Sequence, residues 1–351
     1  MLQFGFIKGD FMKIKILNTL ICLFLAGFVT FFTLDCFIPP VKYKYVNNEI
    51  SNILNKPTYW YYFPAAKKTA KILLKEQQID GGWLKYNEKI RKNRPSYWQF
   101  STFDNDNTTT QIRFLAKMYN KTHKAKYKKA VEKGINFLIG SQYQNGGWPL
   151  VVHDQKTYRR YITYNDNAMV NVLYLLRDVA NKDEEFKFVN SSQVIEARKA
   201  LYSGVNCVLK TQLETNGKKS IWAQQYDEKT LKPQTARDYE PIALSTRESV
   251  EIIKFLQSLN IENTEVQNSI SDAIEWLKKA DTTSIFCIKG INNWYYINSK
   301  YAPKAWNRYY DIQTGEPIFA EKFKILKNFN EISPNRKIKY EWFGYWPKEI
   351  L

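Results

Sequence analysis

The stretch Gln77-Gln-Ile-Asp-Gly-Gly-Trp83 occurs almost unchanged again as Gln142-Tyr-Gln-Asn-Gly-Gly-Trp148. The two copies align without a gap and are 65 residues apart. A third copy, Gln212-Leu-Glu-Thr-Asn-Gly217, follows 70 residues after the second, with Trp222 downstream. A period of this length accommodates one helical hairpin per repeat and indicates a repeat architecture. The glycines suit the turn that ends a helix.

Each unit between these copies has the apolar spacing of amphipathic helices. Ile112, Leu115, Ala116 and Tyr119 recur at i, i+3, i+4 and i+7, and Ala168–Leu176 is a dense apolar run. Ser245 and Glu248 have the spacing of a capping box before another apolar run. Strand-like segments such as Ile285–Ile291 are short and few. We therefore predict an all-α fold, an (α/α)3 toroid of helical hairpins with a few short strands. Each motif tryptophan either packs inside the barrel or stacks on a sugar.

Composition limits the kinds of function. The 351 residues carry a formal charge of +18, which favours a polyanionic partner such as a nucleic acid, an anionic membrane surface or an acidic polysaccharide. The lysines are spread along the chain, however, and also suit a solvated surface. We find no nucleic-acid-binding motif, and the interspersed Trp and Tyr favour carbohydrate. Two histidines, His123 and His153, are too few for a zinc site built on histidines, and a Ser-His-Asp triad is disfavoured. We interpret Cys207 and Cys287 as small packed residues rather than a disulfide.

The N-terminus predicts export. Lys13 and Lys15 precede the apolar run Ile16–Leu34, which suits a signal peptide or a membrane anchor. We divide the chain into residues 1–37 as signal or anchor, 38–58 as linker and 59–351 as catalytic domain. The expected location is secreted, periplasmic or anchored on the outer side of the cytoplasmic membrane, and the expected oligomeric state is a monomer.

A polar cluster follows each motif tryptophan, with its key residue 15 to 21 positions on. The key residues are Asp104, Asp166 and Arg237. Equivalent positions of a hairpin ring lie at the same end, so these three side chains should converge. Both aspartates are suited to helix capping. The excess of carboxylates and amides is also typical of a site for a hard cation such as Ca²⁺.

Five blocks of this sequence resemble the pectate lyases of polysaccharide lyase family 10, which have an (α/α)3 toroid fold. The resemblance spans about residues 77–347. The first three blocks are Gly81-Gly-Trp-Leu-Lys85, Thr102-Phe-Asp-Asn with Thr108–Leu115, and Gln142–Pro149 continuing into Ile162–Val172. The last two are Ile221–Asp227 with Leu231–Glu240, and Trp306–Phe319 with Tyr340–Pro347.

The resemblance implies a residue-by-residue assignment. Asp104 and Asp166 would support calcium-assisted binding of polygalacturonate, and Arg237 would be the Brønsted base of a β-elimination. Arg308 would bind a substrate carboxylate. The further substrate-binding candidates are Lys85, Asn105, Arg160 and Asn165. Guanidinium groups suit such a substrate because they bind carboxylates bidentately. An arginine base needs a lowered pKa or a poised proton.

Several positions depart from the family pattern. Thr235 stands where a lysine usually precedes the Ala-Arg pair, and Tyr161 and Tyr226 replace histidines. Ala320-Glu-Lys-Phe323 replaces a Gly-Arg-Asp-like turn. A catalytically weak uronan-binding relative is therefore an alternative, as is a glycosidase that uses Asp104 and Asp166 as its acid pair. A terpene-cyclase-like barrel is a third, although the chain has no Asp-x-Asp-Asp motif.

Overall fold

The computed structural model describes residues 53–85 and 99–351. Its helical part begins with the short η1 (Thr58–Tyr62) and α3 (Pro64–Glu76). Three pairs follow: α5 (Thr109–Thr122) with α6 (Ala125–Gly140), α7 (Ala168–Ala180) with α8 (Ser191–Lys210), and α9 (Thr246–Ser258) with α10 (Thr264–Lys279). Within each pair the two helices pack against each other. The predicted helical hairpins are therefore present.

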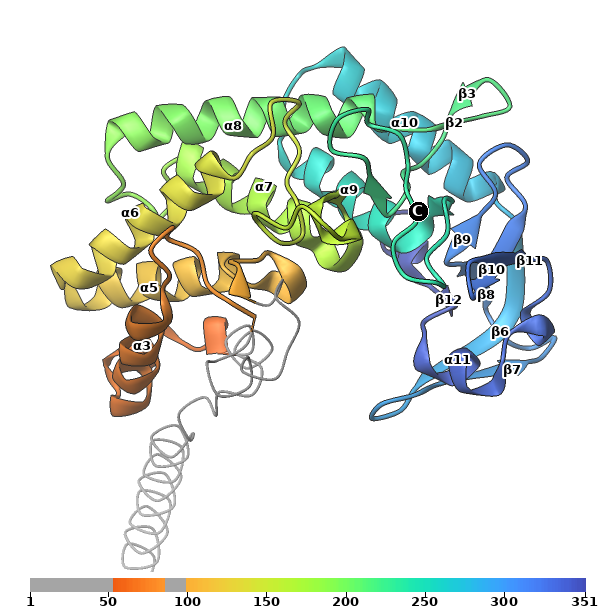
Figure 1. Cartoon of the computed structure of the whole chain (residues 1–351), viewed down its shortest axis with the longest axis horizontal. Helices are drawn as coiled ribbons and strands as arrows, with labels where there is room; N and C mark the ends of the chain where they lie inside the picture. The colour runs from red at the N-terminus through yellow and green to blue at the C-terminus, as the bar shows by residue number, and fades with distance from the viewer. Residues whose placement is uncertain (1–52, 86–98) are drawn as a thin grey trace, which may run out of the picture.

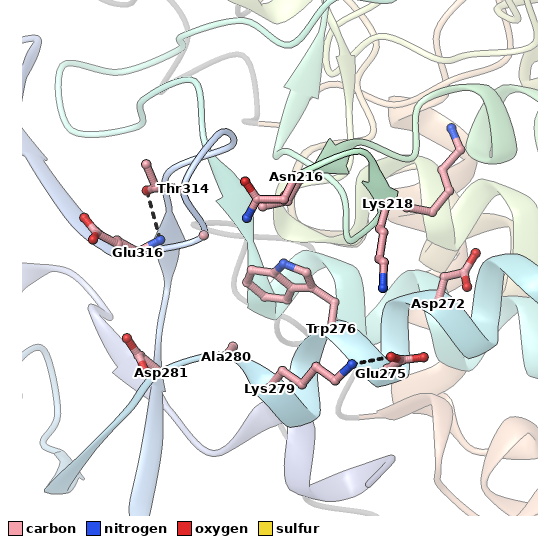
Figure 2. Close-up of a pocket in the computed structure, with 13 residues that line it drawn as sticks. Asn216, Lys218, Asp272, Glu275, Trp276, Lys279, Ala280, Asp281, Thr314 and Glu316 are labelled. Carbon is pink, nitrogen blue, oxygen red and sulfur yellow. Dashed lines mark hydrogen bonds and ion pairs between the residues drawn. The ribbon is translucent and has the colours of Figure 1, made fainter.

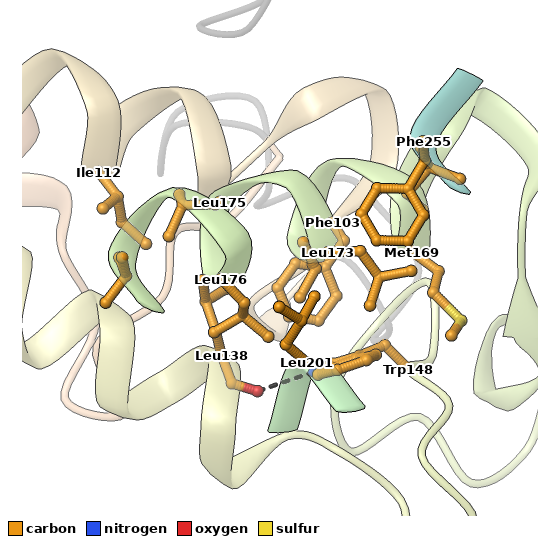
Figure 3. Close-up of a cluster of buried hydrophobic side chains, with 14 of the residues drawn as sticks. Phe103, Ile112, Leu138, Trp148, Met169, Leu173, Leu175, Leu176, Leu201 and Phe255 are labelled. Atoms are coloured by element: carbon orange, nitrogen blue, oxygen red, sulfur yellow. Dashed lines mark hydrogen bonds between the residues drawn. The ribbon is translucent and has the colours of Figure 1, made fainter. Parts of the chain in front are cut away.

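The pairs stack side by side in chain order (Figure 1). The first helices contact one another in the order α5, α7, α9, and the second helices in the order α6, α8, α10. Helix α7 lies in the middle of the array, and its buried Leu173 and Leu176 pack among side chains of its neighbours (Figure 3). Buried apolar area contributes roughly 25 cal/mol per Å², so this continuous core stabilises the hairpins collectively rather than one by one.

The motif tryptophans are buried, and each is bonded to the helix before it. The indole Nε1 of Trp83 donates to the Leu73 carbonyl at 2.9 Å, that of Trp148 to Leu138 at 2.8 Å, and that of Trp222 to Val208 at 2.7 Å. Figure 3 shows the second of these bonds. With exposed fractions of 0 to 1%, these rings pack in the core and cannot stack on a sugar.

A fourth tryptophan is hydrogen-bonded to the helix before it in the same way. Trp306 Nε1 donates to the Leu277 carbonyl at the end of α10, at 2.9 Å. The segment Trp222-x₃-Tyr-Asp-x₂-Thr230 has a counterpart in Trp306-x₃-Tyr-Asp-x₂-Thr314. The aspartate of each accepts hydrogen bonds from the backbone and hydroxyl of the threonine three residues on. The repeat therefore has a fourth copy of its turn, which the Gly-Gly-Trp pattern alone did not reveal.

The glutamine that opens each motif ties its repeat to the next one. Gln77 Nε2 donates to Gly81 within its own turn and to Ala130 in α6. Gln142 makes the same pair of bonds to Gly146 and to Ala200 in α8. Gln212 bonds to Ser220 and to Ser269 in α10. The third, decayed copy therefore keeps the bonding pattern although Asn216 replaces its first glycine.

Two glycines in these turns are required by the backbone. Gly81 and Gly146 have φ of +103° and +94°, which residues with a side chain rarely adopt. A Cβ at Gly146 would lie 2.0 Å from the Ser203 carbonyl oxygen of α8. The turn thus needs glycine both for its φ and for the close approach of the next helix.

The predicted all-α class is wrong, because twelve strands accompany the helices in the described residues. One sheet has the order β11-β10-β9-β5 and another the order β12-β8-β6-β7, and all pairings are antiparallel. The strands of the first are β5 (Leu244–Ser245), β9 (Tyr309–Tyr310), β10 (Pro317–Glu321) and β11 (Lys324–Leu326). Those of the second are β6 (Thr282–Lys289), β7 (Trp294–Asn298), β8 (Lys304–Asn307) and β12 (Phe343–Gly344).

Two small ribbons complete the strands, β1 (Ile162–Thr163) with β4 (Gln225–Tyr226) and β2 (Glu214–Thr215) with β3 (Lys218–Lys219). Both larger sheets join the helical array at its α9–α10 end (Figure 1), where α11 (Pro334–Lys339) also lies. The all-α prediction is wrong because it relies on the Gly-Gly-Trp spacing, which extends only to Trp222 and says nothing of the residues beyond. The aromatic and β-branched run after α10 is typical of strands, and pairing across distant segments stabilises it.

Several predictions concern the ends of the chain. The segment 1–37 and most of the linker 38–58 lie outside the described residues. Within the described part, no helix is both long enough and apolar enough to cross a bilayer. Cys207 and Cys287 are free thiols, as expected.

Candidate functional site

Two strained turns position the acidic side chains at the start of α5 and α7. They contain the short helices η3 (Asp104–Asp106) and η5 (Asn165–Asn167), which contact each other. Asn105, Asp106, Asp166 and Asn167 have φ between 51° and 61°. Asn and Asp tolerate this left-handed region better than other side-chain-bearing residues. Part of the Asn and Asp excess in the sequence therefore has a backbone cause. Neither Asp104 nor Asp166 is an N-cap, because Thr108 is the N-cap residue of α5 and Asn167 that of α7.

Asp104 is at the centre of the cluster. Its buried carboxylate forms an ion pair with Lys85 and accepts a hydrogen bond from Asn105 Nδ2 at 2.8 Å. Burial raises the pKa of Asp104, Lys85 partly opposes this, and Asp166 raises the pKa further while Arg237 lowers it. The turns that carry Asp104 and Asp166 contact each other, as expected from their equivalent repeat positions. The charge of Arg237 also acts on the pKa of Asp104.

A further aspartate belongs to the same cluster. Burial raises the pKa of Asp106, and the Asp166 and Asp104 charges add to this effect. A hydrogen bond from Asn171 Nδ2, 2.5 Å from Asp106 Oδ1, opposes it. The side chain borders a cavity of about 380 Å³ between α5 and α7. Its position two residues after Asp104 was the only sequence signal for it.

Arg237 is held by a buried glutamate. Its guanidinium forms an ion pair with Glu240, which is 1% exposed, and lies over the Tyr239 ring at 5.0 Å. Burial alone lowers the pKa of Arg237, but the hydrogen bond and charge of Glu240 outweigh burial and hold this pKa above the ordinary arginine value. The Nε atom is buried and has no hydrogen-bond partner among the described residues. The arginine is thus protonated in this arrangement, and its buried Nε–H donor is unpaired within this part of the chain.

Arg308 is 2% exposed and belongs to a buried network with Glu248. Its Nη2 lies 3.3 Å from Asn165 Oδ1, and Gln224 Nε2 reaches the same oxygen at 3.2 Å. Ser245 donates its hydroxyl to Glu248, so the predicted capping box is wrong. The glutamate faces the arginine instead, because an unpaired buried guanidinium is far costlier than an uncapped helix. Arg308 therefore supports Asn165, which lies next to Asp166.

Arg160 lies outside this cluster. Its Nε is 3.1 Å from Glu228 Oε1, and its guanidinium lies 4.7 Å from the centroid of the Tyr161 ring. The two side chains of the ion pair line a cavity of about 950 Å³ together with Tyr143, Gln144, Asn145, Asp154, Gln155, Asp227 and Lys229. The predicted substrate-binding residue Arg160 therefore lines a cavity of its own rather than the Asp104 cluster.

Tyr158 is nearer to the cluster than Arg160. Burial raises the pKa of Tyr158; the charges of Arg237 and of Asp104 also act on it, the first lowering and the second raising the pKa. Tyr158 is therefore a further candidate for the site. The sequence pattern did not select it, because charge was the signal used for a uronate site.

A separate cavity of about 740 Å³ lies where α10 meets the β2–β3 hairpin and the turn at Thr314 (Figure 2). Trp276 lies against it, and Lys279 is paired with Glu275 on its floor. None of the predicted site residues lines this cavity. The chemistry-bearing side chains point instead to the Asp104–Arg237 cluster as the candidate active site.

The cluster suits a metal site in which protein side chains supply only some of the ligands. In residues 53–85 and 99–351, no three His, Cys, Asp or Glu side chains are placed to hold a metal by themselves. Asp104 and Asp166 still fit a hard cation, because their carboxylate oxygens are the ligands such a cation prefers and Asp104 is buried in a turn that contacts the turn of Asp166. The remaining ligands would be water or an anionic substrate.

The chain is similar to a known protein family and to solved structures. The family model described as pectic acid lyase matches residues 74–351. A family 10 polysaccharide lyase from Cellvibrio cellulosa has a similar structure, with a TM-score of 0.74 and 26% identity over 87% of this chain and 94% of that chain. A mutant of this lyase in complex with trigalacturonic acid matches with a TM-score of 0.73 and 25% identity over the same shares. A search of curated proteins found no match.

Proposed function

The chain belongs to the pectic acid lyase family and is a polysaccharide lyase; on this premise we propose that it cleaves polygalacturonate by calcium-assisted β-elimination. The observation that carries the proposal is the family match over residues 74–351, and the contact between η3 and η5, which carry Asp104 and Asp166, supports a shared site. A carboxylate pair that holds a cation, together with an arginine, would complement an anionic sugar chain. The similar lyase in complex with trigalacturonic acid supports an acidic substrate.

In the proposed reaction, a base removes the C5 proton of a galacturonate residue, which is α to the C6 carboxylate. The electron pair forms the C4–C5 double bond, and the C4–O bond breaks to release the other part of the chain. Asp104 and Asp166 would hold Ca²⁺ against the C6 carboxylate, where the cation neutralises charge that develops in the transition state. Tyr158 and Asn165 would help to orient the sugar. Lys85 is already paired with Asp104 and would add positive charge for the polymer.

Arg237 is the proposed base, and its ion pair with Glu240 opposes the loss of a proton that this role requires. The glutamate holds the proton on Arg237 in the absence of substrate. Proton transfer therefore needs this ion pair to loosen when the sugar carboxylate and its cation enter. Thr235 supplies no positive charge to help, since the position lacks the lysine of the family pattern. These two features favour a second candidate, a catalytically weak uronan-binding relative.

The Arg308 assignment is also a proposal. Binding a substrate carboxylate requires its guanidinium to reach the cleft, whereas Glu248 and Asn165 hold it in a buried position. The glycosidase and terpene-cyclase alternatives are set aside, because the family membership is that of a lyase.

The test compares Arg237→Ala with Arg336→Ala. Both arginines lie over the Tyr239 ring, with their guanidinium carbons 5.0 and 3.7 Å from its centroid. With polygalacturonate and Ca²⁺, wild type and R336A should release unsaturated uronides that absorb in the ultraviolet. R237A should lose about 10² to 10⁴ in rate, as expected for a general base, while affinity electrophoresis shows retained binding. Equal rates in R237A and wild type would remove Arg237 from the role of base. Retention without product in wild type would establish the binding-only alternative.

We also propose that the protein is exported. The support is the pair Lys13 and Lys15 before the apolar run Ile16–Leu34. Cell fractionation with lyase activity as the readout checks this, and activity confined to the cytosol would contradict it.

A further inference from the structure

The β6–β7 hairpin exposes an apolar face that the rest of the molecule covers only in part, since Phe329 and Ile338 border it on one side. Ile288 pairs with Tyr295 and Phe286 with Ile297 across the ribbon, which places all four side chains on one face. They are 38 to 54% exposed, and Ile291 in the connecting turn is 99% exposed. A large contiguous apolar surface of this kind marks a contact site more often than it marks plain solvent-facing structure.

The other face of the hairpin is the one that packs. Ile285 is 1% exposed, and Tyr296 bonds to the backbone of Tyr340 and Trp342 at 3.0 and 2.8 Å. Cys287 N donates to Tyr345 Oη at 3.2 Å. The ribbon is therefore firmly attached, and the exposed face is a stable feature of the surface rather than a loose segment.

The hairpin lengthens the last repeat without changing the contact of its tryptophan with the preceding helix. Successive motif tryptophans are 65, 74 and 84 residues apart, and β6–β7 lies in the longest interval, between α10 and Trp306. Trp306 still reaches the end of α10 despite the added residues. Figure 1 shows the ribbon extending past α11 at the lower edge of the molecule. The helical array thus supports the hairpin, while the hairpin adds a surface.

The charge of this region is one-sided. Residues 282–310 contain Lys289, Lys300, Lys304 and Arg308 but no Asp or Glu. Arg308 is buried, whereas the three lysines are exposed and form no ion pair within the described residues. Two of them lie near aromatic rings of the same region, Lys289 5.5 Å from the Trp294 centroid and Lys300 5.0 Å from that of Tyr301.

We infer that the β6–β7 hairpin docks on the surface of an anionic phospholipid bilayer, with Ile291 and the Phe286–Tyr295 face entering the interface. Trp and Tyr favour the headgroup level, and isoleucines gain from burial in the acyl boundary. Lysines beside an anionic leaflet contribute attraction that falls off within a Debye length. Lys304 pairs with Ser284 and so lies on the same face as Phe286 and Ile288, whereas Lys289 and Trp294 lie on the opposite face close to the turn. The apolar face, with Lys304 on its own side and Lys289 beside the tip, is complementary to such a membrane, and a neutral partner would leave these lysines unused.

The experiment uses the full chain and vesicles of phosphatidylcholine with or without about one-third phosphatidylglycerol. Residues 1–52 contain an apolar run of their own, so binding is read at the hairpin by hydrogen exchange of peptides covering 286–298. The test variant is Ile291→Ser with Tyr295→Ser. The matched control is Ile79→Ser, since Ile79 is 97% exposed but is a lone apolar residue in another turn.

Anionic vesicles should slow exchange in 286–298 for wild type and I79S, and high salt should reverse the effect. The double variant should need about tenfold more lipid for the same protection, while its lyase rate on soluble polygalacturonate equals that of wild type. Equal protection in the double variant would overturn the inference, as would equal protection by phosphatidylcholine alone. A dimer that the double substitution dissociates, without protection by vesicles, would show instead that a second copy covers this face.

Discussion

Glu248 and Arg308 form a charge pair that solvent does not reach, at 2% exposure for both side chains. Burial by itself would raise the pKa of Glu248, yet Arg308 and other partners lower it below the ordinary glutamate value. The pair also positions Asn165 beside the candidate metal ligand. Its contribution is therefore to geometry as well as to charge balance.

Removing one partner should leave the other buried and uncompensated. We expect Glu248→Gln to lower the free energy of unfolding by about 3 to 5 kcal/mol, measured by urea denaturation. Adding Arg308→Met should restore most of that loss. The control is Arg247→Met, which breaks a half-exposed pair with Glu341 at 3.2 Å and should cost less than about 1 kcal/mol. If E248Q proves as stable as wild type, the network is not a structural unit.

The raised pKa of Asp104 and of Asp106 has a consequence for calcium. Metal binding needs ionised carboxylates, and a raised pKa keeps part of each group protonated at a pH where an ordinary aspartate is fully ionised. Calcium affinity should therefore fall as pH is lowered through a range that begins above the usual aspartate pKa. Calorimetric titration with Ca²⁺ at a series of pH values measures this.

Two variants calibrate that measurement. Asp104→Asn should abolish calcium binding, whereas Asp272→Asn, in the separate Trp276 cavity, should leave it unchanged. A wild-type affinity that stays constant down to the ordinary aspartate range would contradict the role of this cluster in metal binding.

The turn after α6 requires particular residues to bring one hairpin against the next. Gly146 combines a left-handed φ with direct contact to the α8 backbone, and Gln142 bonds to both sides of the same junction. The motif thus sets how closely one hairpin approaches the next. This function explains why both glycine and glutamine recur with the tryptophan.

Gly146→Ala should lower the free energy of unfolding by at least about 2 kcal/mol, because the backbone is strained and the Cβ overlaps the Ser203 carbonyl. Gly140→Ala is the matched control. It lies at the end of the same α6, and a Cβ there would meet nothing within 4 Å. That change should be neutral or raise stability by up to about 1 kcal/mol. Similar losses in both variants, by thermal or urea unfolding, would contradict the assigned role of the turn.

Charge is a property of the whole molecule and should govern the encounter with substrate. At +18, the protein attracts a polyuronate over distances comparable to the Debye length. Raising ionic strength from about 20 to about 200 mM should raise KM severalfold and change kcat less than twofold. Initial rates at fixed free Ca²⁺ give both constants. A KM that does not respond to salt would assign recognition to short-range contacts alone.

Local sequence determined the repeat, its three helical hairpins and the family. Glycine, glutamine and tryptophan at fixed spacing report a turn whose requirements are local, and helical periodicity is likewise a property of neighbouring residues. Counting forward from each tryptophan also selected Asp104, Asp166 and Arg237, because equivalent repeat positions lie at one end of the array. Their proximity was therefore predictable, although their individual roles remain proposals.

Only the tertiary structure decided the sheets and the partners of the charged residues. Strands such as β5 and β9 pair segments more than 60 residues apart, and no local pattern encodes which segments pair. Trp306 takes its place as the fourth buried indole despite the inserted hairpin. Arg237 meets Glu240, and Arg308 meets Glu248 rather than open solvent, because a buried charge must be paired and packing determines which partner is near.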